Sequence, residues 1–207
     1  PQCPGCNSAA RDKRHYKESF QRDHPKHKDE MTMDQVGMSD LNGTLGIGKY
    51  RYAIVFCKIA EDYWTFVPLK TLAFEESENA FRQFCSGAYG DDNLHKALVY
   101  CDAHSTLVQI CDTYSLLRRH PPPGRPQANA VIERKVGIVL DGIRKTTVSA
   151  GLPNCFWPFA GHAFAVNDTL EQKGGELSSW ERTLGKVTFR KFVFGQLVFF
   201  RPAPTIT

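Results

Sequence analysis

A long amphipathic helix is expected near the middle of the chain, and it opens with Pro126-Gln127-Ala128-Asn129-Ala130-Val131-Ile132-Glu133-Arg134-Lys135. Apolar residues recur at a spacing of three and four, which predicts a helix buried along one side; they are Ile132, Val136, Val139, Leu140 and Ile143. Glu133 follows the first of them by one residue, about 100° of helical turn. Its neighbours on the same face are small or polar, so we expect its carboxylate to be open to a metal ion and a polymeric substrate.

Length and composition limit the classes of protein that the chain can belong to. Of its 207 residues, 42% are apolar and 12% are aromatic, which is enough for one substantial core with short appendages. The chain has no apolar run of roughly eighteen residues or more, so we expect no membrane contact. The net charge of +4 permits binding to a polyanion but does not by itself predict it.

The start of the chain and its cysteines indicate the kind of protein it comes from. The chain begins with Pro1 and has no charged and then apolar signal segment, so we expect a fragment of a longer protein. Its seven Cys are an odd number, and most stand in apolar runs. This placement favours reduced, buried thiols in an intracellular protein over a disulfide framework.

From residue 31 onward the hydrophobic pattern is that of a sheet followed by helices. Strands are expected at residues 31–36, 50–59, 63–67 and 97–101, and Pro68 favours an edge position for the third of them. Helices are expected at residues 74–86, 105–117, 126–150 and 154–170, with one or two short strands in the tail. This order predicts an α/β fold, a mixed β-sheet flanked by helices on both faces, in which chemistry gathers at the carboxyl ends of central parallel strands.

Three acidic residues, Asp34, Asp102 and Glu133, occupy positions from which they could converge. Each also has a purely structural interpretation. Asp102 could cap the helix that follows it, and Glu133 could be a solvated acid that suits the helix dipole. Asp34 is the hardest to explain in this way, because an acid inside an apolar strand is costly without a partner or a metal. Together, in this order of elements, the three predict a common acidic site.

Three segments of the chain resemble the blocks of a retroviral-type integrase core. They are Thr32-Met33-Asp34-Gln35-Val36-Gly37, Tyr100-Cys101-Asp102 and the stretch from Arg125 to Lys135. The resemblance is strongest to the copia-type retrotransposon polyproteins, in which the third block typically reads Pro-Gln-x-Asn-Gly-x-x-Glu-Arg, with Ala130 at the Gly position here. Leu152-Pro153, Phe156-Trp157 and Phe194-Gly195 also resemble dipeptides that follow in those proteins.

The resemblance implies an RNase H-like fold and Mg2+-dependent polynucleotidyl transfer, comprising 3′-end processing and DNA strand transfer. Asp34, Asp102 and Glu133 would be the catalytic residues and would hold two divalent ions, Mg2+ or Mn2+. The resemblance also implies DNA as the partner, both the element ends and the target. It further implies a homo-oligomer and a place in the nucleus.

The same resemblance divides the chain into three parts. Residues 1–30 would be a linker and the remnant of an HHCC-type zinc module, residues 31–173 the integrase catalytic core, and residues 174–207 a C-terminal extension. We expect the first part to be an extended basic arm and the last a short β-rich tail. Cys3 and Cys6 resemble the end of the zinc module and supply two of the four ligands that Zn2+ needs, so they predict an incomplete zinc site or a plain surface turn.

Residues around the start of the long helix are candidates for DNA contacts, because helix N-termini and positive charge favour phosphate. These candidates are Arg125, Gln127, Asn129, Arg134 and Lys135. For the basic residues among them, a solvated helix face is the alternative.

Two features near Asp102 depart from the family pattern. The stretch between Asp102 and Glu133 is shorter than is usual in the family, and Ala103-His104-Ser105 replaces a small turn after the second Asp. A displaced Asp102 would impair a two-metal site. Two other interpretations therefore stand beside the integrase core: a catalytically decayed DNA-binding or assembly module, and an RNase H-like nuclease that cleaves without joining strands.

Overall fold

The computed structural model describes residues 29–38, 44–89, 97–119, 130–172, 174–188 and 193–196. The elements, in chain order, are β1 (Glu30–Gly37), β2 (Tyr52–Lys58), β3 (Tyr63–Leu69), α2 (Phe74–Ala88), β4 (Leu98–Tyr100), α3 (Ser105–Thr113), β5 (Leu117–Arg119), α4 (Ala130–Ser149), the short 3-10 helix η4 (Asn154–Phe156), α5 (Trp157–Thr169) and α6 (Ser179–Leu184). Within these described ranges, no helix combines the length and the apolar character needed to cross a membrane.

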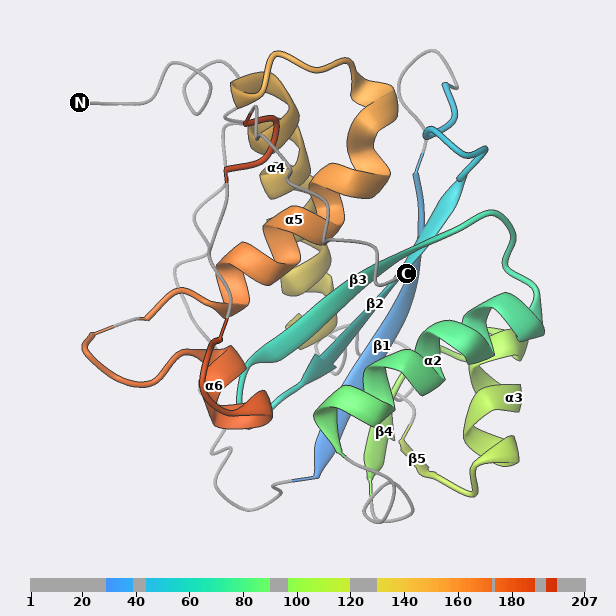
Figure 1. Ribbon diagram of the computed structural model, residues 1–207. Helices are drawn as coiled ribbons and strands as arrows, with labels where there is room; N and C mark the ends of the chain where they lie inside the picture. Colours follow the sequence, from blue (N-terminus) through green and yellow to red (C-terminus); the bar gives the residue numbers. More distant parts are fainter. Residues whose placement is uncertain are drawn as a thin grey trace, which may run out of the picture.

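Five strands form one mixed sheet in the order β3-β2-β1-β4-β5 (Figure 1). β1 is antiparallel to β2 and β2 to β3, whereas β4 runs parallel to β1 and β5 parallel to β4. Helices cover both faces, with α4 and α5 over one and α2 and α3 over the other. The predicted mixed sheet flanked by helices is confirmed. β3 ends the sheet on one side, as Pro68 indicated.

Alternating side chains of the central strands divide the interior into two cores. From β2, Ile54 and Phe56 enter the core under α2 and α3, whereas Ala53, Val55 and Cys57 enter the core under α4 and α5. All five side chains are fully buried. The nearly continuous apolar run of this strand therefore reflects burial on both faces of the sheet.

The predicted helix over residues 105–117 is wrong at its end. α3 stops at Thr113, and Ser115 takes a left-handed backbone conformation with a φ of 52°. This conformation ends the helix, and the chain turns back to run parallel to β4. Leu117 therefore begins a fifth strand, β5, which the helical pattern of the preceding residues concealed.

The described part of the tail contains a short helix, α6, that was not predicted. The Ser178 hydroxyl accepts the Glu181 N–H at 3.2 Å, while the Glu181 carboxylate accepts the Ser178 N–H at 3.0 Å. This capping box starts α6, and its Ser-x-x-Glu pattern could have been read from the sequence. Trp180 and Leu184 then pack against the core under α2 and α3. The aromatic residues on which the predicted strands rested lie almost entirely outside the described residues.

Two glycines allow α4 and α5 to pack closely on each other and on the sheet. A Cβ at Gly142 of α4 would overlap the ring of Phe164 in α5, and a Cβ at Gly161 of α5 would overlap the ring of Phe66 in β3. Protein interiors are packed too densely to absorb such a methyl group without a shift. This packing holds α4, the helix that carries Glu133, against its neighbours.

Substitution of Gly142 by Ala is expected to lower the free energy of unfolding by about 1–3 kcal/mol, because the added methyl group overpacks the α4–α5 contact. Chemical denaturation followed by circular dichroism measures this change. Gly137→Ala is the matched control on the same helix, since Gly137 is exposed and its Cβ would meet nothing within 4 Å. The control is expected to stabilise the protein by about 0.5–1 kcal/mol. Equal effects of the two substitutions would contradict this view of the contact.

Candidate acidic site

The central strands place two of the predicted acids at matching positions. Asp34 lies in β1, and Asp102 follows β4 by two residues. β1 and β4 are parallel, with Thr32 opposite Tyr100, so Asp34 and Asp102 stand two residues further along their respective chains. Strand alternation turns Asp34 away from Met33, which is buried in the core under α2 and α3. The face of β1 that carries Asp34 is therefore the face covered by α4.

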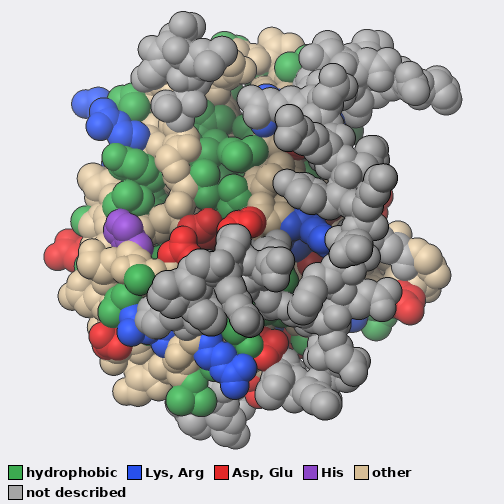
Figure 2. Space-filling model, turned by 180° about the vertical axis from the view of Figure 1, so that it is seen from behind, with side chains coloured by type: hydrophobic (Ala, Val, Ile, Leu, Met, Phe, Trp, Pro, Cys, Tyr) green, Lys and Arg blue, Asp and Glu red, His purple; other side chains and the backbone are tan. Residues whose placement is uncertain are grey.

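The third acid, Glu133, lies in the first turn of α4. Its side chain is exposed, whereas Ile132 beside it is buried in the core under α4 and α5. α4 packs against both β1 and β2. The exposed position agrees with the interpretation of the sequence, which placed Glu133 at the edge of the buried stripe. Figure 2 shows the face seen from behind, where acidic side chains gather near the centre with apolar side chains beside them.

Electrostatics connect the three acids. The pKa of Asp34 is raised from 3.8 to about 6, mainly by burial and then by the negative charge of Asp102. A hydrogen bond from the Gln35 backbone N–H acts in the opposite direction, and the charge of Glu133 adds a smaller upward contribution. Asp102 and Glu133 are therefore close enough to Asp34 for their charges to oppose its ionisation. Acids from β1, the end of β4 and the start of α4 thus share one electrostatic environment.

The donor set suits a hard divalent cation, because carboxylate oxygens are the ligands that Mg2+ and Mn2+ prefer. A cation would also offset the repulsion that raises the pKa of Asp34. Among the residues that the structure describes, no group of three or more His, Cys, Asp or Glu side chains is arranged to hold a metal ion. The three carboxylates therefore interact through their charges without forming a closed ligand shell.

Lys135 must be removed from the candidate DNA contacts. It is only 7% exposed, and its Nζ pairs with Asp62 Oδ1 at 2.6 Å. The same Nζ lies 5.6 Å from the centre of the Trp64 ring. Lys135 thus points into the molecule, because two residues along a helix from Glu133 is about 200° around its axis.

Of the other predicted site residues, only Arg134 lies within the residues that the structure describes. Arg134 is exposed beside Glu133, as a DNA contact requires. Five predicted site residues lie outside the described residues: the DNA contacts Arg125, Gln127 and Asn129, and Cys3 and Cys6 of the incomplete zinc site.

Two further acids, Asp112 and Asp168, have contrasting surroundings. Asp112 is exposed on α3, on the other side of the sheet from α4. Asp168 is less exposed, and its Oδ2 accepts a hydrogen bond from Trp64 Nε1 at 2.7 Å. Asp168 thereby joins α5 to β3.

A chain of polar side chains on the same face of the sheet as Asp34 was missed in the sequence. Tyr100 OH donates to Glu30 Oε1 at 3.2 Å, and Arg119 Nη1 donates to Tyr100 OH at 3.4 Å. Glu30 precedes Asp34 by four residues in β1, so strand alternation places both on the same face. That even spacing within a strand is the signal that could have identified Glu30. Arg119 could not have been found, because β5 itself was not predicted.

The five described cysteines are free, and four of them are buried, which agrees with the expected reduced thiols.

Comparisons with known proteins add no assignment. A scan of protein-family models found no match to the chain, and a search of curated proteins found none either.

We expect Asp34→Asn to raise the melting temperature at pH 8 in the absence of divalent cations. The pKa of this carboxyl group rises from 3.8 to about 6 on folding, so ionisation of the group destabilises the native state relative to the unfolded state. The wild-type protein should therefore lose stability as the pH rises from 4 to 6, and Asp34→Asn should not show this loss. Differential scanning calorimetry in the presence of a chelator measures the difference between the two proteins at each pH. A difference that stays constant with pH would contradict the raised pKa, and Asp112→Asn serves as the exposed control.

Proposed function

We propose that the chain is the catalytic core of a retrotransposon-type integrase with an RNase H-like fold. The observation that carries this proposal is the effect of two charges, Asp102 and Glu133, on the pKa of Asp34. The resemblance of the sequence implied that these three acids, far apart along the chain, act together. The strand order β3-β2-β1-β4-β5, with β1 antiparallel to β2 and parallel to β4, supports the proposed fold.

Asp34, Asp102 and Glu133 would hold Mg2+ or Mn2+ at the end of the two parallel strands. When bound, the divalent ions would supply activation of the attacking oxygen and stabilisation of the leaving oxygen in an in-line displacement at a phosphodiester. Asp34 is the least exposed of the three acids, so its carboxylate is best held by the surrounding sheet. Asp102 and Glu133 are exposed and border the side from which a DNA strand would approach.

The protein's own contribution is to orient the substrate and to offset its charge. Arg134 is exposed next to Glu133, and Arg119 is exposed on β5 with its guanidinium bonded to Tyr100. Both lie on elements that border the acids, so we propose that they contact the phosphate backbone. DNA ends and target DNA would be the partners, in a homo-oligomer located in the nucleus.

Strand transfer with a short duplex tests the proposal. We expect Mn2+- or Mg2+-dependent joining by the wild-type protein, and a loss of about a hundredfold or more in Asp34→Asn, Asp102→Asn and Glu133→Gln, the size typical of losing a group that stabilises the transition state. Denaturing gel electrophoresis of labelled oligonucleotides measures both cleavage and joining. Asp112→Asn is the matched control and should retain full activity, since this acid lies on α3 on the other side of the sheet.

The outcomes separate the candidate functions. Joining that survives Glu133→Gln would overturn the role of that residue. Cleavage that depends on all three acids but never proceeds to joining would indicate the RNase H-like nuclease. DNA binding without any metal-dependent chemistry would indicate the decayed binding or assembly module.

A further inference from the structure

The Lys135 side chain is an unusual element of the interior. Lysine is seldom buried because removing its charge from water is costly, and a buried Lys is normally paired. Lys135 is paired with Asp62 at 2.6 Å, and the exposed fraction of the side chain is 9% for Lys135 and 48% for Asp62. The pair is therefore reached by water from the Asp62 side only. It lies on the opposite side of α4 from Glu133.

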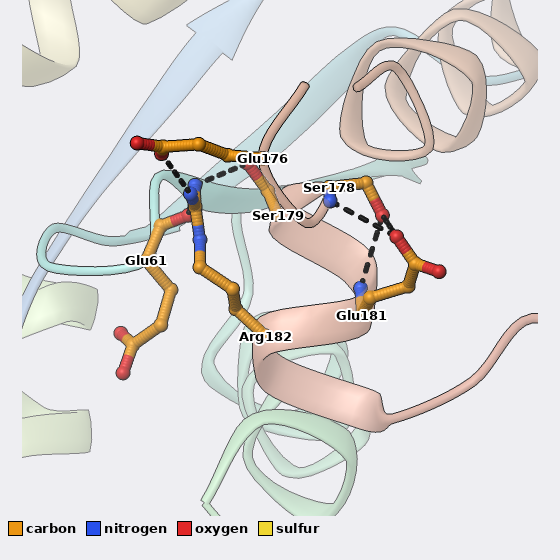
Figure 3. Close-up of polar contacts among 6 residues, drawn as sticks. All are labelled: Glu61, Glu176, Ser178, Ser179, Glu181 and Arg182. Carbon is orange, nitrogen blue, oxygen red and sulfur yellow. Dashed lines mark hydrogen bonds and ion pairs between the residues drawn. The ribbon is translucent and has the colours of Figure 1, made fainter. Parts of the chain in front are cut away.

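The partner of Lys135 is itself held in place. Asp62 belongs to the turn between β2 and β3 and has a left-handed backbone conformation with a φ of 53°. A residue other than Gly keeps such a conformation only where its surroundings hold it. The same turn is also hydrogen-bonded to α6, since Arg182 Nη2 donates to the Glu61 carbonyl at 2.9 Å (Figure 3). The turn is thus a fixed anchor for the ammonium group of Lys135.

A second contact ties Lys135 to the sheet. Its ammonium group lies over the ring of Trp64, which is 1% exposed, and Trp64 Nε1 donates to Asp168 of α5 at 2.7 Å. A cation over an aromatic face is attracted by the ring, more strongly when it is shielded from water. Lys135 therefore connects α4 to the β2–β3 turn and, through Trp64, to α5. These contacts restrict rotation of the first turns of α4 about the helix axis.

We propose that Lys135 is a positioning residue, whose contacts with Asp62 and Trp64 set the rotation of α4 and so place the Glu133 carboxylate beside Asp34 and Asp102. This inference rests on the proposed function, because it gives Glu133 a metal to hold. A role in stability alone is a weaker explanation, since buried ion pairs contribute little net stability compared with apolar residues of similar volume. Their best-attested use is to specify one arrangement among several.

A double-mutant cycle on Mn2+ affinity tests the inference with the full chain. Isothermal titration calorimetry is carried out with Mn2+ on wild type, Glu133→Gln, Lys135→Met and the protein with both changes. We expect Lys135→Met to weaken Mn2+ binding by about tenfold, the lower end of what loss of a residue supporting a metal ligand costs. In the Glu133→Gln background the same change should have no further effect, because Lys135 acts through Glu133. Losses that multiply in the double variant would overturn the inference.

Matched variants separate positioning from folding. Lys135→Arg keeps the charge and should restore most of the affinity lost in Lys135→Met. Asp62→Asn breaks the same pair from its exposed side without creating a cavity, so it should weaken Mn2+ binding even if Lys135→Met fails to fold. Arg144→Met removes the 3.2 Å ion pair to Asp141 further along α4 and should leave the affinity unchanged. A loss of affinity in Arg144→Met as large as that in Asp62→Asn would overturn the inference.

The cycle also distinguishes failure of the acidic site from failure of the positioning role of Lys135. If Glu133→Gln itself leaves Mn2+ affinity unchanged, the proposed acidic site fails and the inference fails with it. If Glu133→Gln weakens binding but Lys135→Met and Asp62→Asn do not, the site stands and the positioning role of Lys135 is wrong.

Discussion

The position of β1 at the centre of the sheet is the constraint on which the rest of the structure depends. β1 pairs antiparallel with β2 and parallel with β4. It therefore joins the antiparallel part of the sheet, β2 and β3, to the parallel part, β4 and β5. Burial on both sides fixes its register, because a slip by one residue would turn Met31 and Met33 out of their core. The same register turns Asp34 toward α4. The location of the acidic site thus follows from the packing of the residues on either side of Asp34.

Ionisation of Asp34, an acid in the central strand, is electrostatically unfavourable in the folded protein. Asp34 is partly buried, and the charges of Asp102 and Glu133 oppose its ionisation further. A structure selected only for stability would replace such a residue with a neutral one. The close packing of α4 and α5 at Gly142 and Gly161 instead holds the helix that carries Glu133 against its neighbours. Rigid surroundings that keep like charges together are typical of sites where a cation or a polar substrate binds.

The parts of the fold that could be predicted are those in which the hydrophobic pattern has a single interpretation. The apolar run of β2 is too short for a helix, and the apolar stripe of α4, with its spacing of three and four, is too long for a strand. Both elements were therefore identified. β5 was missed because it has three residues and begins at Leu117, which continued the apolar pattern of α3. Its start depends on the backbone of Ser115, which the pattern of side chains does not reveal. α6 was missed although its capping box was visible, because the aromatic residues further along the tail suggested strands.

The acids of the candidate site could be named from the sequence, but the contacts that place them could not. Asp34, Asp102 and Glu133 each belong to a motif that is local along the chain. The pairing of Lys135 with Asp62 joins residues that are far apart along the chain, and only the three-dimensional structure brings them together. In the sequence Lys135 stands next to Arg134, and proximity along the chain suggested a shared role in binding DNA. The helix separates the two by about 100°, which exposes Arg134 to solvent and turns Lys135 into the core. Adjacent basic residues thus have opposite surroundings: Arg134 faces solvent, whereas Lys135 pairs with Asp62 inside the molecule.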